Sequence, residues 1–183
     1  GDLSGDLWSE AKLTNILLSN PDTLLSIDTL ALEYDVLSLF SSTFQVNKVY
    51  IAGADANIKE TDSKAFNLQQ VLVEDTEEAT TSEPFYFNLQ RIQINNLNTS
   101  VYSPTYLPDG FLKVQDLNFL GSLASEESIS ASISDLNFLV KEGRFPEAIQ
   151  VQTAASFEDE TITLQKLVVE TGRTVLKAEA KSD

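Results

Sequence analysis

The chain contains no histidine, no cysteine and no methionine among its 183 residues. Without cysteine it has no disulfides, no thiolate nucleophile and no cysteine-ligated zinc or iron–sulfur site. Without histidine it has no Ser-His-Asp triad, no imidazole base and no histidine-ligated metal. The missing initiator methionine leads us to expect an excised piece of a longer protein. Composition therefore excludes enzymes and metal sites that depend on cysteine or histidine.

Positive charge is also scarce: the chain has 12 Lys and Arg but 28 Asp and Glu, which gives a net charge of −16. The acidity is spread along the chain: residues 1–61, 62–122 and 123–183 carry −6, −5 and −5. No basic patch is hidden behind the average. Nucleic acid and acidic lipid headgroups would be repelled by such a chain, so we expect no nucleic-acid partner.

Long hydrophobic runs, glycine and proline are all in short supply. No window of 18 apolar residues exists, so no transmembrane helix is expected, and the polar start does not resemble a signal peptide. The 7 Gly and 5 Pro are scattered and form no linker. The composition is otherwise that of a folded protein, with 42% hydrophobic and 22% charged residues.

Several segments alternate between apolar and polar residues, which is typical of half-buried strands. Residues 85–89, 129–133 and 149–157 are the clearest examples. Helical periodicity is weak. It predicts one short helix over 35–41, with Asp35 at the N-cap, and a second over 64–70.

A repeated pattern, apolar-x-x-apolar-x-apolar, underlies these segments, and two copies share the letters DLNFL. The three-residue step breaks the alternation once per strand, which predicts a β-bulge that bends and twists the sheet. A chance match to a loose template is the alternative. The eight copies are Leu13/Ile16/Leu18, Ile27/Leu30/Leu32, Val46/Val49/Ile51, Leu68/Val71/Val73, Leu89/Ile92/Ile94, Val114/Leu117/Phe119, Ile133/Leu136/Phe138 and Leu164/Leu167/Val169.

These patterns predict a mainly β protein with one apolar face and one neutral-polar or acidic face. Roughly ten strands would curl rather than stay flat, so either two sheets close as a sandwich or one sheet curves into a groove. We predict a long curved antiparallel sheet, a β-taco, groove or half-barrel, with one or two short helices. Residues 1–183 would form a single fragment of a larger repeat-like protein, with a mobile loop at 74–84 and a second loop at 102–110.

Catalytic chemistry finds little support in the residues. The acidic clusters fall in predicted turns, where they are expected to be solvated, and no calcium-binding loop or phosphate-binding glycine loop is present. The lone Trp8 is interpreted as a core anchor rather than a ligand platform. We therefore predict no enzyme, no catalytic residue, no metal and no cofactor. The clusters are Glu74/Asp75, Glu77/Glu78, Glu126/Glu127 and Glu158/Asp159/Glu160.

The apolar face itself is the remaining candidate site. A row of Leu- or Phe-sized side chains open to water needs a protein lid or an apolar guest. Each lipid methylene moved out of water contributes about 0.8 kcal/mol, so phospholipid acyl chains would fill a groove favourably. The predicted lipid-binding groove residues are Leu30, Leu32, Val49, Ile51, Ile92, Ile94, Leu117, Phe119, Leu136, Phe138, Leu167 and Val169.

The order of these motifs resembles the N-terminal part of the TamB family, within the AsmA-like superfamily. The chain opens G-x-L-S-G, and the turn at residues 41–43 departs from the family's pattern, which often has a glycine with a basic residue there. FNLQQVL at 66–72, FYFNLQRIQINN at 85–96 and SISDLNFLVKEGRFP at 132–146 also fit. The matching single residues are Leu13, Asn15 and Ile16, then Leu25, Ile27, Asp28, Leu30, Leu32 and Tyr34, then Val46, Val49, Ile51, Gly53 and Ile58.

The resemblance implies a periplasmic protein anchored in the inner membrane, with a β-rich body that forms a hydrophobic groove. Its function would be phospholipid transport between membranes and outer-membrane biogenesis. An Omp85-family outer-membrane partner would bind a C-terminal region that this sequence lacks. Two alternatives from other classes stay open: a non-catalytic β-sandwich adhesin or carbohydrate-binding module, and a hydrolase with two buried carboxylates about 5–9.5 Å apart.

Overall fold

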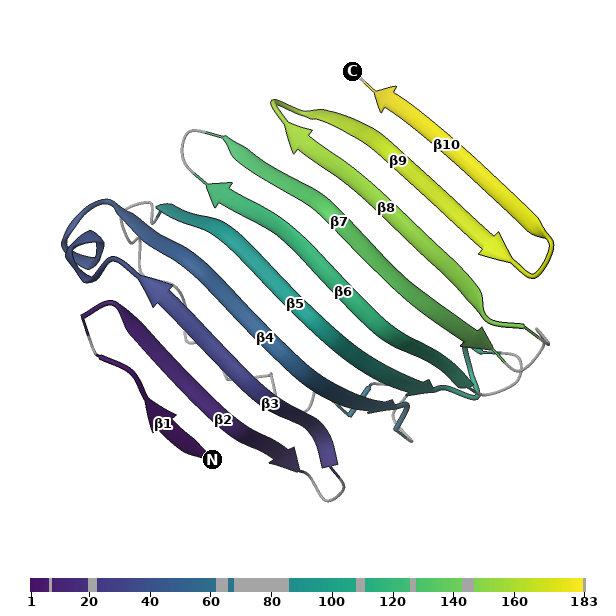
Figure 1. Ribbon diagram of the computed structural model, residues 1–183, viewed down its shortest axis with the longest axis horizontal. Helices are drawn as coiled ribbons and strands as arrows, with labels where there is room; N and C mark the ends of the chain where they lie inside the picture. The colour runs from purple at the N-terminus through teal and green to yellow at the C-terminus, as the bar shows by residue number, and fades with distance from the viewer. Residues whose placement is uncertain are drawn as a thin grey trace.

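The computed structural model describes residues 1–6, 8–19, 23–61, 66–67, 86–107, 111–125, 128–142 and 147–182. These residues form one open sheet of ten strands whose spatial order is the order of the sequence (Figure 1). The strands are β1 (Asp2–Ser4), β2 (Glu10–Ser19), β3 (Thr23–Tyr34), β4 (Thr43–Lys59), β5 (Tyr86–Tyr102), β6 (Phe111–Ser125), β7 (Ile129–Glu142), β8 (Ile149–Glu158), β9 (Thr161–Thr171) and β10 (Thr174–Ser182).

Neighbouring strands are antiparallel except for β4 and β5, which pair in parallel from Thr43↔Tyr86 to Lys59↔Tyr102. The prediction of a wholly antiparallel sheet is therefore wrong at this one pair. A parallel neighbour requires a crossover connection, because the chain must return to the end of the sheet where β4 begins. Nothing in the alternation of the two strands reveals their relative direction.

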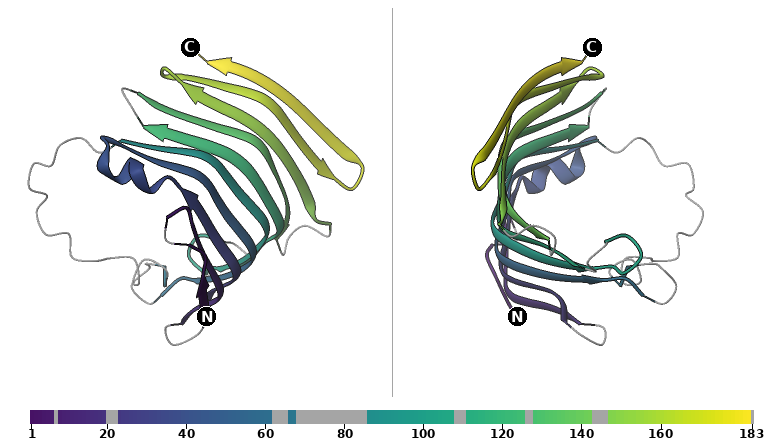
Figure 2. Two further views of the ribbon diagram at one scale, coloured as in Figure 1. Left: turned by 60° about the vertical axis from the view of Figure 1, so that its left-hand side comes forward. Right: turned by 90° about the vertical axis from the view of Figure 1, so that its right-hand side faces the viewer.

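Midway along their length the strands bend, so that the sheet forms a trough running across the strands from β1 to β10 (Figure 2). The two edge strands stay apart and the sheet does not close. The predicted mainly β, curved sheet is confirmed. We call the concave side of the sheet the trough and the opposite side the convex face.

The bend follows a line of irregular positions, the bulge seam, where the ladder skips residues. Four seam residues have positive φ: Asn15 (53°), Gly53 (61°), Asn96 (56°) and Asp116 (53°). Bulges increase local twist and bend a strand. The seam crosses Asn15 in β2, Asp28 in β3, Gly53 in β4, Asn96 in β5, Asp116 in β6 and Ser134–Asp135 in β7, and continues through skips in β8, β9 and β10.

The predicted three-residue step coincides with such a skip in every copy that the structure describes. In β7, for example, Ile133 pairs with Ala155 and Leu136 with Thr153, so two residues of β7 lie opposite one of β8. In a regular strand, two residues three positions apart point to opposite faces. The extra residue at the skip compensates for this odd spacing, so the apolar residues on both sides of the step lie on the same face. The copy at 68–73 lies outside the described residues.

A second layer does not cover the sheet within the described part of the chain. Each strand there contacts only its neighbours in the sheet, and the only other contact between elements is that of η1 (Val36–Phe40) with β4. Three hydrophobic residues in the described ranges are fully buried: Leu24, Val46 and Ala54. The two packed sheets of a sandwich are therefore not what these residues form.

The short helix predicted over 35–41 is confirmed in place and in its cap, although it is a 3-10 helix. The Asp35 side chain accepts a hydrogen bond from the Leu37 amide at 2.9 Å. The loop at 102–110 is a turn in its described part, where Ser103 donates to Glu60 at 2.6 Å. The mobile loop at 74–84 and most of the second helix at 64–70 lie outside the described residues.

Candidate functional site: an apolar trough

One row of directly paired residues crosses the trough from β2 to β10, and most of its members are apolar. Residues paired across a sheet project from the same face, so the row shares one side. It consists of Leu13, Leu30, Ile51, Ile94, Phe119, Leu136, Thr153, Leu167 and Ala178.

A second row lies on the same face, two residues from the first row in most strands and three residues from it in β7 and β9, where the seam intervenes. Its members are Ala11, Leu32, Val49, Ile92, Gly121, Ile133, Ala155, Leu164 and Ala180. Beyond the first row, Leu117 pairs with Leu97, and Phe138 is joined to Val169 through Val151. The structure therefore brings all twelve predicted groove residues onto one face.

All twelve are half-buried: none is fully enclosed and none is fully exposed. The chain as a whole exposes 12357 Å², whereas a compact monomer of 20.2 kDa exposes about 8,800 Å². Since these side chains touch strand neighbours but no opposing layer of the described elements, they contribute to that excess. Their outer surfaces are available to an apolar guest.

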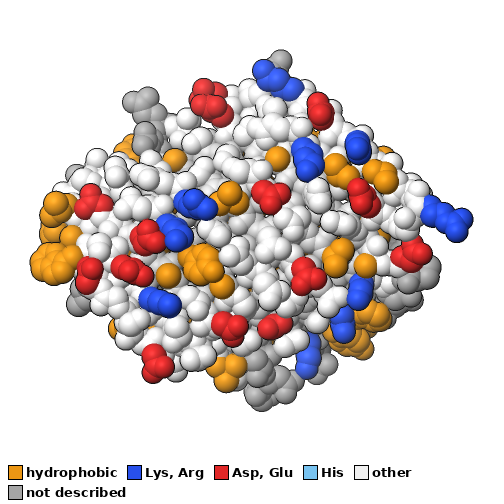
Figure 3. Space-filling view, in the orientation of Figure 1, with side chains coloured by type: hydrophobic (Ala, Val, Ile, Leu, Met, Phe, Trp, Pro, Cys, Tyr) orange, Lys and Arg blue, Asp and Glu red, His pale blue; other side chains and the backbone are white. Residues whose placement is uncertain are grey.

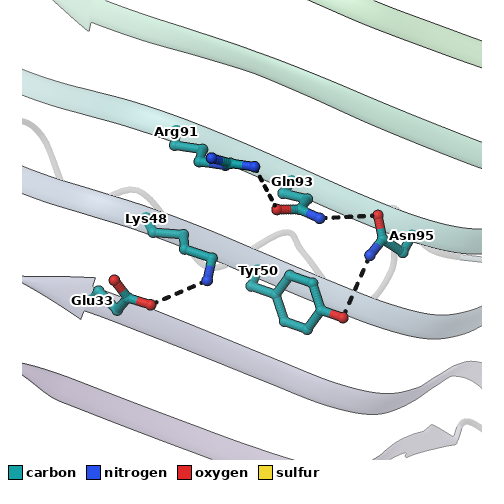
Figure 4. A network of polar contacts seen from close by, with 6 residues as sticks. All are labelled: Glu33, Lys48, Tyr50, Arg91, Gln93 and Asn95. Carbon is teal, nitrogen blue, oxygen red and sulfur yellow. Dashed lines mark hydrogen bonds and ion pairs between the residues drawn. The ribbon is translucent and has the colours of Figure 1, made fainter.

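The opposite face carries polar side chains, which shows that the sheet is two-sided. On the convex face Lys48 bonds Glu33 at 3.2 Å, and its ammonium lies 5.3 Å from the centre of the Tyr50 ring (Figure 4). Asn95 and Gln93 continue this network with hydrogen bonds of 3.4 Å to the Tyr50 hydroxyl and 3.3 Å between each other. Figure 3 shows acidic and basic side chains scattered over this face.

Alternation then fixes the direction of the intervening side chains. Val49 and Ile51 flank Tyr50 in β4, and Ile92 and Ile94 flank Gln93 in β5. Since successive side chains of a strand point to opposite faces, these four point into the trough. The direction of these side chains follows from the alternation of apolar and polar residues alone, so it could be predicted from the sequence.

Gly121 gives the Phe119 ring room on the trough floor. A Cβ built on Gly121 would lie 2.7 Å from the Phe119 Cζ atom and would overlap the Ser132 carbonyl oxygen. The ring therefore lies against the glycine backbone, and any larger residue would displace it. Sequence reasoning missed this role, because Gly121 directly follows the repeat and carries no pattern of its own.

A shallow apolar pocket of about 250 Å³ lies on the same face over β7, β8 and β9. Small residues make room for it, because Ala131 and Ala155 stand beside the larger Phe157 and Ile162. Ala131 pairs with Phe157, which pairs with Ile162, so the pocket walls belong to the trough surface. Such a volume is below the range typical of whole drug-sized ligand sites, and fits part of a chain-like guest.

Asparagine side chains bond backbone groups that the seam leaves unpaired. Asn118 accepts from the Asn96 amide at 3.1 Å, and Asn98 accepts from the Asp116 amide at 3.1 Å. The Asn118 amide group also donates to the Asp116 carbonyl at 2.8 Å and to Asn137 at 3.2 Å. This explains the repeated D-L-N-F-L: Asp and Asn build the bulge while Leu and Phe line the trough.

Two other sequence interpretations can be compared with the structure. Trp8 is 74% exposed, so its interpretation as a core anchor is wrong; it stands on the turn between β1 and β2, which no other described element covers. The acidic cluster 158–160 is exposed, as predicted, and the other three acidic clusters lie outside the described residues.

Groups that could carry out chemistry are sparse in the part of the chain that is described. No three His, Cys, Asp or Glu side chains there are placed to hold a metal ion. Glu142 is the only buried carboxylate among those residues, so the buried pair that a hydrolase would need is not found in them. No helix within the described ranges is long and apolar enough to cross a membrane.

No protein-family model and no curated protein matches the chain. The geometry of the trough is therefore the strongest guide to function.

Proposed function

We propose that this chain is a segment of a lipid conduit, whose trough holds the acyl chains of phospholipids while they pass between membranes. The observation that carries the proposal is the continuous apolar trough, nine strands wide in its main row and half-exposed throughout. A guest made of methylenes needs no hydrogen-bonding partner, and the apolar trough offers few hydrogen-bonding groups.

The energetics favour a guest of this kind. Each methylene that leaves water contributes about 0.8 kcal/mol, so a chain segment of ten methylenes would gain about 8 kcal/mol before its ordering cost. Phe119, Phe138 and the leucines around them supply dispersion contacts along such a chain. The pocket beside Phe157 adds a deeper place along the same surface.

The resemblance to the TamB family, within the AsmA-like superfamily, supports the same function. Under this proposal the protein acts in the periplasm, anchored in the inner membrane and engaged with an Omp85-family partner through regions outside this sequence. The net charge of −16 fits a scaffold kept soluble by its convex face, with no strong headgroup site.

Site-specific photo-crosslinking tests the proposal. A photoreactive phenylalanine analogue is placed at position 94, in the trough, or at the matched position 93 on the convex face, and cells are irradiated. We expect phospholipid adducts from position 94 and few from position 93. Equal adducts from both positions, or none from position 94, would refute the conduit. Adducts to glycans in place of lipid would support the adhesin or carbohydrate-binding alternative.

A further inference from the structure

Four large apolar side chains protrude at one rim of the trough, and we call them the rim knob. Leu37, Leu39 and Phe40 of η1 are 71%, 56% and 87% exposed, and Trp8 is 74% exposed. Figure 2 shows η1 on the concave side of the sheet. Figure 3 shows hydrophobic side chains gathered at the left-hand end of the view, where η1 lies in Figure 1.

The rim knob is formed by two neighbouring segments, the β1–β2 turn with Trp8 and η1 with the other three side chains. The Tyr34 amide donates to the Ser9 carbonyl at 2.9 Å, next to Trp8 on one side and Asp35 on the other. The β1–β2 turn is thereby tied to the N-cap of η1. Trp8 and the three η1 side chains therefore belong to one local surface.

Polar contacts below the rim knob hold it outward. In the turn, the Asp6 carboxylate accepts from the Trp8 amide at 3.0 Å and from the Ser9 amide at 2.8 Å. Beneath η1, the buried Ser38 hydroxyl accepts from the Gln45 amide at 2.9 Å. The β1–β2 turn and η1 are thus held in shape by their own hydrogen bonds. The apolar side chains are exposed although the backbone that carries them is ordered by these bonds.

A second copy of the chain is a poor occupant for this surface. The four side chains together expose on the order of 500–600 Å², whereas a stable interface uses about 800 Å² on each partner. Two chains of charge −16 would also repel each other. An acidic membrane is disfavoured for the same reason.

A neutral bilayer interface matches the chemistry better. Trp, Phe and Leu are the residues that enter the headgroup region of membranes, and η1 has no acidic residue in its first turn and no basic residue in its last. We propose that the rim knob inserts into the interfacial region of a zwitterionic bilayer and brings the rim of the trough to the lipids. This inference rests on the proposed function, since it gives the conduit a place to exchange chains.

The only tryptophan reports on the inference directly. Purified protein is titrated with phosphatidylcholine vesicles while the emission of Trp8 is recorded, with brominated phosphatidylcholine as the quencher. We expect a blue shift and strong quenching. Phe40→Asp should lower the partition coefficient about tenfold or more, because a large apolar contact is replaced by a charge. Leu37→Ser is a second variant should the first fail to fold.

The matched control is Val175→Asp in the edge strand β10, where a side chain that is 55% exposed pairs with Glu170 on the convex face and lies far along the sheet from η1. It should bind vesicles like the parent protein. Vesicles containing phosphatidylglycerol should bind more weakly, and more so at low salt.

Three results would overturn the inference: no shift with phosphatidylcholine vesicles, equal losses for Phe40→Asp and Val175→Asp, or tighter binding to the anionic vesicles. A shift produced by monomeric short-chain lipid alone would also overturn it, because Trp8 would then report loading of the trough. Phe119→Asp separates the two proposals, since it should impair loading of the trough and leave the vesicle shift intact.

Discussion

Replacing Asn118 by alanine tests whether the asparagine side chains hold the bulge seam. Its side chain makes three hydrogen bonds: to the Asn96 amide (3.1 Å), to the Asp116 carbonyl (2.8 Å) and to Asn137 (3.2 Å). Each is worth about 0.5–1.5 kcal/mol net. Because two of the three are solvent-exposed, we expect Asn118→Ala to lower the free energy of unfolding by about 1–2 kcal/mol.

Urea unfolding followed by far-UV circular dichroism measures this change. Asn47→Ala is the matched control, because Asn47 is an exposed strand asparagine that makes no side-chain hydrogen bond to the described residues. Its effect should stay within about 0.5 kcal/mol. A double-mutant cycle between Asn118→Ala and Asn137→Ala should give a coupling of about 0.5 kcal/mol or more. Equal losses for Asn118→Ala and Asn47→Ala would refute the role of the seam.

Three further outcomes follow from single sites. Gly121→Val should cost more than about 2 kcal/mol in urea unfolding, since it displaces the Phe119 ring, and a melt equal to the parent would contradict that packing. Thr99→Val should raise stability by about 1 kcal/mol, because the buried Thr99 hydroxyl has no partner in the described part of the chain; a loss of stability would show that the hydroxyl is satisfied. The hydrogen bond from the Ser9 side chain lowers the pKa of Asp6, so its carboxyl should titrate below 3.8 by NMR, and the turn should loosen only as the pH falls through that lowered pKa; a midpoint above 3.8 would contradict the geometry.

The trough was predictable because it depends on which face a side chain occupies. Leu30, Ile51 and Phe119 were assigned to one face by the spacing of apolar residues, and the register places them in one row. Skips in that spacing also predicted the bulges. The period of two and its interruptions are local properties of the chain, so no knowledge of the tertiary structure was needed.

Other features depend on contacts between strands that the pattern does not encode. The parallel pairing of β4 with β5 is a relation between two strands, and the role of Gly121 follows from the Phe119 ring that lies against it. Asn96 and Asp116 could have been found, because Asn and Asp tolerate positive φ better than other non-glycine residues. Asp116 lies within the three-residue step of its repeat and Asn96 lies two residues after Ile94, so the residue type near the repeat was the available signal.

Trp8 was misplaced for a physical reason. A large aromatic residue is usually buried, and that tendency presumes that a second layer exists to bury it. A single open sheet provides that layer to few residues, and the described chain buries only three hydrophobic residues fully. The same shortage of cover makes the trough a candidate binding surface.

Native mass spectrometry of the purified protein tests the central claim most directly. Phe119 points into the trough, whereas Leu120 pairs with Gln93 and lies on the convex face, so Phe119→Asp and Leu120→Asp add the same charge to opposite faces. Our account predicts that the parent protein and Leu120→Asp retain bound phospholipid and that Phe119→Asp loses it. A parent protein free of lipid after expression in a lipid-rich host, or equal occupancy in the two variants, would contradict the account.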